Sequence, residues 1–122
     1  MTLQELYETI GGDYDQALQV LRVDKLLDKH IRKFASSGVV EGLLGAGESM
    51  DQTELFEKAH ACKGVCANLG LMKLSKLASE ITEEYRPGNA RTLSDEEVKD
   101  RIAAIRELYA QTVEGIRKYE ES

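Results

Sequence analysis

Residues 51–70 of the chain read DQTELFEKAHACKGVCANLG, and this stretch decides the fold. Asp51 can cap a helix because Glu54 follows three residues later, while Met50 and Leu55 flank the cap as an apolar pair. Beyond this start, apolar residues return at steps of four and three, which places them along one side of a helix. This seam consists of Leu55, Ala59, Cys62, Cys66 and Leu69. We therefore predict a long amphipathic helix over about residues 52–69.

The sequence that follows predicts two more long helices. Gly70 permits a turn, and an apolar seam that ends at Tyr85 indicates a second helix over about residues 71–86, antiparallel to the first. Ser94 and Glu97 form a capping box, after which apolar residues recur every three or four positions as far as Tyr119. A helix over about residues 95–119 follows.

The N-terminal third of the chain predicts shorter elements. Capping and apolar patterns indicate helices over residues 3–10 and 14–21, and heptad-like spacing indicates a longer one over about residues 23–36. Residues 38–47 contain four glycines, which make a regular helix costly, so we predict a loop there. The fold class is thus all-α: one domain spanning residues 1–122, an antiparallel four-helix bundle with a short N-terminal helical cap. Its bundle helices are about 23–36, 52–69, 71–86 and 95–119.

Composition excludes several classes of function. Sixteen Lys and Arg against 22 Asp and Glu give a net charge of -6, which opposes binding to nucleic acid. The apolar runs are only a few residues long, so we expect no membrane anchor, and the N-terminal residues do not resemble a signal peptide. We expect a cytoplasmic protein. Cys62 and Cys66 share one helix face as small apolar residues, and a disulfide framework is not expected.

The residues that can carry chemistry lie in the middle of the predicted helix 52–69. His60 is next to the apolar seam, at the edge of the packed face or in solvent, where a neutral imidazole can act as a nucleophile. Lys63 and Gly64 lie beside it on the next helical turn. A glycine inside a helix costs about 0.5–1 kcal/mol relative to alanine, so a close approach by another molecule would explain it. An imidazole, an ammonium and an open path together suit phosphoryl transfer.

This arrangement resembles the histidine-containing phosphotransfer (HPt) domain of multistep phosphorelays. The family's usual core is His-x-Leu-Lys-Gly with a glycine ten residues after the histidine, and His60, Lys63, Gly64 and Gly70 match it. Cys62 stands where the family usually has Leu or Ile. The resemblance covers most of the chain.

The resemblance implies a phosphoryl carrier. His60 would accept phosphate from an aspartyl phosphate on one response-regulator receiver domain and pass it to another. Lys63 would stabilise the phosphoryl group, Gly64 would admit the receiver, and Gly70 would make the hairpin turn. Receiver domains and a hybrid histidine kinase are the expected partners of a monomeric chain. The chain would bind no cofactor itself, and Mg²⁺ would be on the receiver. Without a nucleotide-binding pattern, autonomous kinase activity is not expected.

Further residues are candidates for partner contact. Phe56 lies one turn before His60, although partial burial against a neighbouring helix would explain it equally well. Some family members carry a Gln and a basic residue on the next helix, and counting across the hairpin places Thr82 and Arg86 at those positions. Ala67 is a further candidate contact. His30 lacks any comparable surroundings and is interpreted as structural or solvated.

Two alternatives stay open. A metal site could use His60, Cys62, Cys66 and His30, although no four-ligand set of familiar spacing is present. A helical docking or scaffold bundle without phosphotransfer is the main alternative, since a fold alone does not give a function. That alternative predicts that replacing His60 changes nothing.

Overall fold

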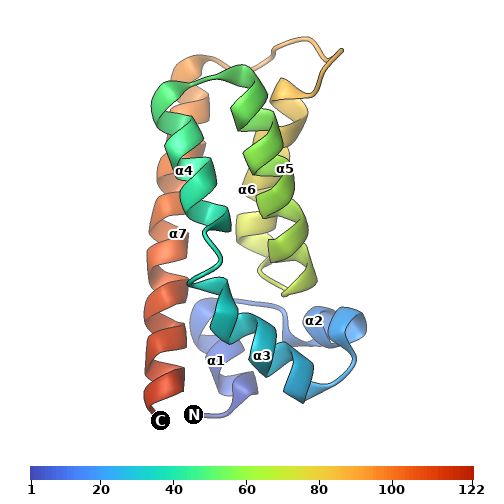
Figure 1. The fold of residues 1–122 in the computed structure, drawn as a ribbon, viewed down its shortest axis with the longest axis vertical. Coiled ribbons are helices and arrows are strands. Elements are labelled where there is room, and N and C mark those ends of the chain that lie inside the picture. The colour runs from blue at the N-terminus through green and yellow to red at the C-terminus, as the bar shows by residue number, and fades with distance from the viewer.

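The computed structural model describes residues 1–122 and contains seven α-helices and no strand (Figure 1). The helices predicted to begin after Thr2, Asp51 and Ser94 do so, and each cap side chain accepts the backbone N–H three residues on. The all-α class is therefore confirmed. The helices are α1 (Leu3–Ile10), α2 (Tyr14–Leu21), α3 (Asp24–Phe34), α4 (Val39–Ser49), α5 (Gln52–Asn68), α6 (Met72–Tyr85) and α7 (Asp95–Glu121). No helix is both long and apolar enough to cross a membrane.

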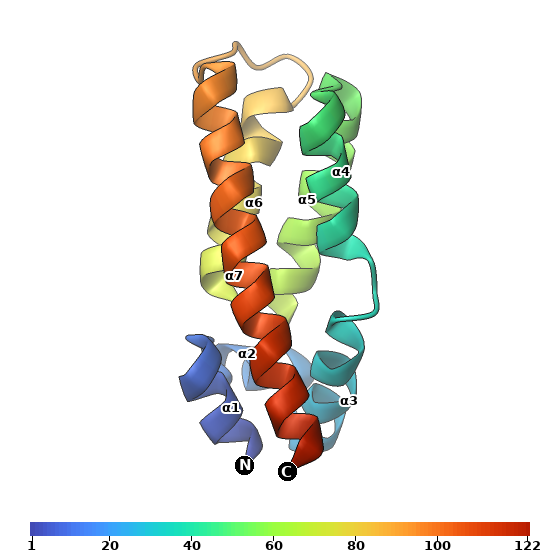
Figure 2. The ribbon, with the colours of Figure 1, turned by 90° about the vertical axis from the view of Figure 1, so that its left-hand side faces the viewer.

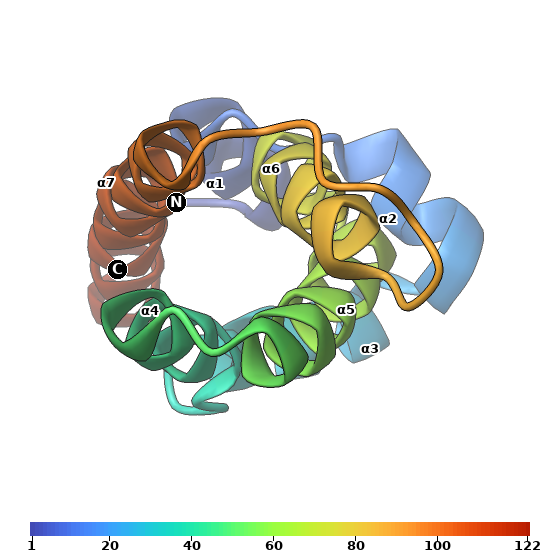
Figure 3. The same cartoon turned by 90° about the horizontal axis from the view of Figure 1, so that it is seen from above.

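Helices α4 to α7 form the antiparallel four-helix bundle. Seen from above, they surround a common axis in chain order, and each packs against its neighbours in the ring (Figure 3). The long α7 runs the full length of the molecule, and its C-terminal half extends past the bundle to pack against α1 and α3 (Figure 2). Helices α1, α2 and α3 therefore form a cap at one end of the bundle.

Two of the sequence predictions are wrong here. Residues 38–47 were expected to form a loop, but α4 occupies Val39–Ser49. The predicted bundle helix 23–36 is the shorter α3, which belongs to the cap, and α4 takes its place in the bundle. The reason is tertiary packing, which outweighs the helix propensity of about 1 kcal/mol lost at each glycine. Three apolar side chains of α4 are buried in the core, namely Val40, Leu43 and Ala46.

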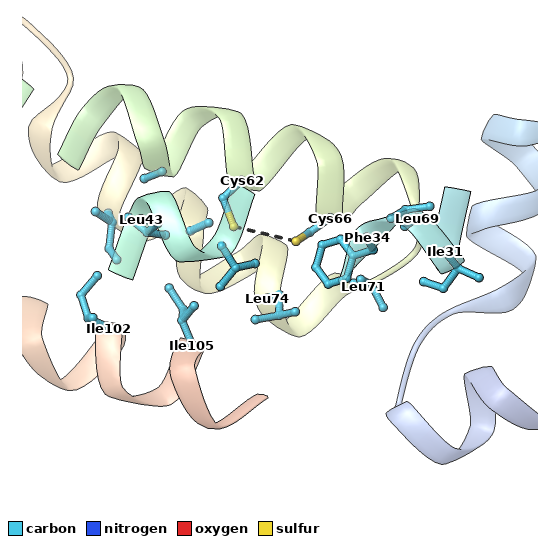
Figure 4. Packing of buried hydrophobic residues seen from close by; sticks show 14 of the residues in the cluster. Ile31, Phe34, Leu43, Cys62, Cys66, Leu69, Leu71, Leu74, Ile102 and Ile105 are labelled. Atoms are coloured by element: carbon cyan, nitrogen blue, oxygen red, sulfur yellow. Dashed lines mark hydrogen bonds between the residues drawn. The ribbon is translucent and has the colours of Figure 1, made fainter. Parts of the chain in front are cut away.

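The core is continuous from the bundle into the cap. It contains 24 buried hydrophobic residues, and Figure 4 shows Ile31 and Phe34 of the cap close to Leu69 and Leu71 at the lower end of the bundle. Cys62 and Cys66 are free thiols inside this core, with sulfurs 3.9 Å apart. They are packing residues of α5, as the helix seam predicted.

Gly70 fixes the turn between α5 and α6 against the cap. Its φ is +71°, a left-handed conformation that favours glycine, and its carbonyl accepts the N–H of Asp13 at 2.8 Å. The Tyr7 hydroxyl donates to the neighbouring carbonyl of Leu69 at 2.6 Å. These bonds fix the C-terminal end of α5 against the cap. They therefore also fix the positions of the residues one and two turns earlier on α5.

Candidate functional site

The imidazole of His60 lies exposed on the outer face of α5. Ala59, one residue before it, is completely buried, so the rotation of the helix fixes which side of α5 faces the core. His60 is therefore held on a rigid helix and is open to a reactant from solvent.

Phe56 and Arg86 extend the surface around this histidine. The rings of Phe56 and His60 are stacked, with centroids 5.8 Å apart and planes 13° from parallel. Just after the end of α6, the guanidinium carbon of Arg86 lies 5.3 Å from the centroid of the Phe56 ring. Phe56 is half-buried, so its packing contributes to the fold and also supports the imidazole. The structure thus brings His60, Phe56 and Arg86 into one cluster.

Lys63 and Gly64 lie on the helical turn that follows. The carbonyl of Lys63 accepts the hydroxyl of Ser75 at 3.2 Å, which links α5 to α6 beside the site. Lys63 forms no ion pair within the chain. Its ammonium group is therefore available to an anion beside His60.

Gly64 is exposed, and a Cβ atom placed on it would meet nothing within 4 Å. The contrast with Gly115 of α7 is sharp, because a Cβ there would lie 2.4 Å from Cγ2 of Ile10. Gly115 is required by packing within the chain, whereas no contact within the chain explains Gly64. Its φ is not positive, so the backbone does not require glycine either.

The structure corrects the prediction for Thr82. Its side chain is completely buried, and its hydroxyl donates to the carbonyl of Ala78 at 2.8 Å. Counting across the hairpin does not give the rotation of α6, and Thr82 faces the core, so it is not part of the exposed surface. Ala67 is half-buried, one turn beyond Lys63, and is partly accessible there.

Glu83 belongs to the cluster, although the sequence alone predicted no role for it beyond a place on the same helix face as Arg86. Arg86 Nε donates to Glu83 Oε2 at 2.7 Å, and Arg86 Nη2 donates to Glu83 Oε1 at 3.2 Å. The bond to Arg86 lowers the pKa of the Glu83 carboxyl, and the charge of Lys63 acts in the same direction. The spacing of Glu83 and Arg86, three residues apart at the C-terminal end of α6, was the signal that could have found this pair.

A shallow cavity of about 250 Å³ lies where α5 meets the cap, and it was also missed. Its walls come from α5 and from α2 and α3, and His30 and Lys33 give it a basic rim. On α5 it begins at Val65 and Asn68, close to Gly64. The lining residues are Leu21, His30, Lys33, Phe34, Ser37, Val65, Asn68 and Leu69. We call it the cap groove.

The residues of the alternative metal site are not brought together. Cys62 and Cys66 are buried in the core, whereas His60 is exposed on the opposite side of α5. No group of three or more His, Cys, Asp or Glu side chains has a geometry that could hold a metal ion.

Comparison with known proteins gives one result. The sequence matches the family model described as "Hpt domain" over residues 3–114, which is most of the chain. A search of curated proteins found no match, and neither did a search of solved structures. The match includes the cap, the whole of α4 to α6 and most of α7.

Proposed function

The chain belongs to the Hpt domain family, whose members carry phosphoryl groups in two-component systems. We propose that His60 is the residue of this chain that carries the phosphoryl group. In this proposal a receiver domain with an aspartyl phosphate donates to His60, and a second receiver domain takes the group from it. A hybrid histidine kinase would supply the phosphoryl group to the first receiver. The chain is a carrier and generates no phosphoryl group itself.

The transfer needs no reactant other than the aspartyl phosphate and the imidazole. The lone pair of one imidazole nitrogen forms a bond to phosphorus while the bond from phosphorus to the aspartyl oxygen breaks, and the carboxylate leaves. The proton on the other ring nitrogen passes to solvent, which leaves a neutral phosphorylated ring. Such a transfer is catalysed mainly by positioning and by stabilisation of charge.

The residues around His60 fit these two tasks. Phe56 restricts the imidazole by stacking on one face, so that the ring loses little freedom when the receiver arrives. Lys63 lies on the next turn of α5, and its ammonium can stabilise the anionic oxygens of the group in transfer. Mg²⁺ and the remaining catalytic groups would come from the receiver.

The open space at Gly64 is the observation that carries the proposal. An exposed glycine in mid-helix lowers stability, and neither packing nor backbone conformation within the chain requires it. A receiver has to bring its aspartate to the imidazole within bonding distance, and any side chain at position 64 would stand beside that path. The cap groove adjoins this path and supports a contact with the same partner.

The test uses purified receiver domains that are phosphorylated and loaded with Mg²⁺. We expect at least one of them to label the chain, with a product that is labile in acid and stable in base, as a phosphohistidine is. The His60→Gln variant should lose the label and keep its helicity by circular dichroism.

The matched control is His30→Gln, because His30 is the only other histidine and is also exposed. This variant should be labelled like the parent chain. Equal labelling of His60→Gln and the parent would refute the assignment. Absence of any label, under conditions in which another Hpt domain is labelled by the same receivers, would favour the docking bundle.

A further inference from the structure

The side chain of Glu83 is connected to the imidazole of His60 through two intermediate residues, Arg86 and Phe56. Its carboxylate holds the guanidinium of Arg86 through both oxygens, the guanidinium lies against Phe56, and Phe56 stacks on His60. The guanidinium of Arg86 is therefore already paired with the carboxylate of Glu83 when His60 is unmodified.

The ion pair is exposed enough to exchange partners. The side chains of Arg86 and Glu83 keep 38% and 49% of their accessible surface, so solvent can replace either partner at little cost. A phosphoryl group carries more negative charge than a carboxylate and offers three acceptor oxygens to a guanidinium. Once such a group is on His60, it competes with Glu83 for Arg86, and the two anions repel one another.

We propose that Glu83 is an exchangeable counter-ion of the phosphoryl site, which holds Arg86 beside Phe56 until His60 is modified and then yields it to the phosphoryl group. This inference rests on the proposed function of His60. Glu83 is a positioning residue, since it acts through Arg86 and does not touch the reacting atoms. Because Glu83 can take the guanidinium back, it keeps the phosphoryl group on His60 from being held too tightly to be passed on.

Phosphoramidate is a suitable probe because it donates a phosphoryl group to imidazole without any partner protein. Its P–N bond breaks and ammonia leaves as the imidazole nitrogen bonds to phosphorus. Mass spectrometry of the digested chain would give the rates of modification at His60 and His30 separately. His30 is an internal control for the donor, because it lies on α3, away from Glu83.

The variants compared are Glu83→Gln, Arg86→Gln and the double substitution, with Glu107→Gln on α7 as the control for loss of one negative charge. We expect Glu83→Gln to raise the rate at His60 roughly two- to fivefold, the size expected for a partly exposed charge pair, and to leave His30 unchanged. Glu107→Gln should change neither rate. In the Arg86→Gln background the gain from Glu83→Gln should disappear, since no guanidinium remains to be released.

Two results would overturn the proposal. One is an equal rate at His60 for Glu83→Gln and Glu107→Gln. The other is a gain that persists without Arg86, because Glu83 would then act by repulsion alone and no exchange would occur. If receiver domains label His60 and either of these results is found, the inference about Glu83 fails and the proposed function stands. If receiver domains do not label His60, the proposed function fails first.

Discussion

A Cβ atom on Gly70 would lie 2.2 Å from the carbonyl oxygen of Asp13, so the turn after α5 and the loop before α2 touch through their backbones. The contact is secured by the hydrogen bond from Asp13 N–H to the Gly70 carbonyl at 2.8 Å. The position of the helix that carries His60 therefore depends on a residue without a side chain.

We expect Gly70→Ala to lower the free energy of unfolding by roughly 3–5 kcal/mol, because the new methyl group meets backbone that cannot move aside. The matched control is Gly38→Ala. Gly38 also has a positive φ, of +77°, but a Cβ there would meet nothing within 4 Å. Gly38→Ala should therefore lower the free energy of unfolding by only about 1–2 kcal/mol, the conformational cost of a left-handed backbone for alanine. Urea unfolding of the two variants measures the difference, and equal losses would show that the contact with Asp13 is unimportant.

Glu84 makes the stability of the chain depend on pH. Its buried carboxylate accepts the N–H groups of Thr92 and Leu93 and pairs with Arg91 at 2.7 Å, which fixes the loop between α6 and α7. Burial alone would raise the pKa of Glu84, but these bonds outweigh it and lower the pKa from 4.5 to about 2.

Because the pKa of Glu84 is lower in the folded chain, its carboxylate stabilises the fold fully at pH values above the pKa of Glu84 in the unfolded chain. This stabilisation is lost as the pH falls through the pKa of Glu84 in the folded chain. Between pH 4.5 and about 2 we expect the chain to lose up to about 3 kcal/mol from this group. Glu84→Gln should lower the free energy of unfolding at neutral pH by about 2–3 kcal/mol and flatten its pH dependence in that range. Glu107→Gln is the control at an exposed position. A parent and a Glu84→Gln variant with the same pH dependence would contradict the role of Glu84.

The sequence was sufficient where local chemistry decides the structure. The helix starts at Asp51 and Ser94 depend on side chains that bind backbone three residues away, and both were predicted correctly. The exposed edge position of His60 followed from the seam of α5. These features need no information about distant residues.

The misses share one cause, which is contact between segments far apart in the chain. Helix α4 exists because Val40, Leu43 and Ala46 enter the core of the bundle, and helix propensity alone argued against it. The burial of Thr82 depends on how α6 is rotated against its neighbours, which a count of residues across a hairpin does not give. The cap groove requires α2, α3 and α5 to meet, and nothing in any one of these segments indicates it.

The two cysteines should be inert to thiol reagents in the folded chain. Both side chains are completely buried, and the contact with Cys62 together with burial raises the pKa of the Cys66 thiol, which disfavours its reactive thiolate. We expect an aromatic disulfide reagent to modify neither thiol in buffer over minutes and to modify both at once in concentrated urea. Rapid modification of one thiol in buffer would show that α5 opens locally, next to the site.

Gly64 offers the clearest separation of stability from function. We expect Gly64→Ala to raise the free energy of unfolding by about 0.5–1 kcal/mol, because alanine favours a helix and the methyl group meets nothing within the chain. The same substitution should slow transfer from a receiver domain, and Gly64→Gln should slow it further, because each added atom stands beside the path to His60.

Gly45 of α4 is the matched control for this effect. It is also an exposed helical glycine at which a Cβ would meet nothing within 4 Å, but it lies on a different helix from His60. Gly45→Ala should therefore give the same gain in stability and leave the transfer rate unchanged. The transfer rate is measured by stopped flow and the free energy of unfolding by urea, for the parent chain and for Gly64→Ala, Gly64→Gln and Gly45→Ala. If Gly64→Ala and Gly45→Ala behave alike in both measurements, the open space at Gly64 has no part in admitting a partner. If only Gly64→Ala loses transfer while both gain stability, the glycine is retained at a cost to the fold for the sake of an approaching protein.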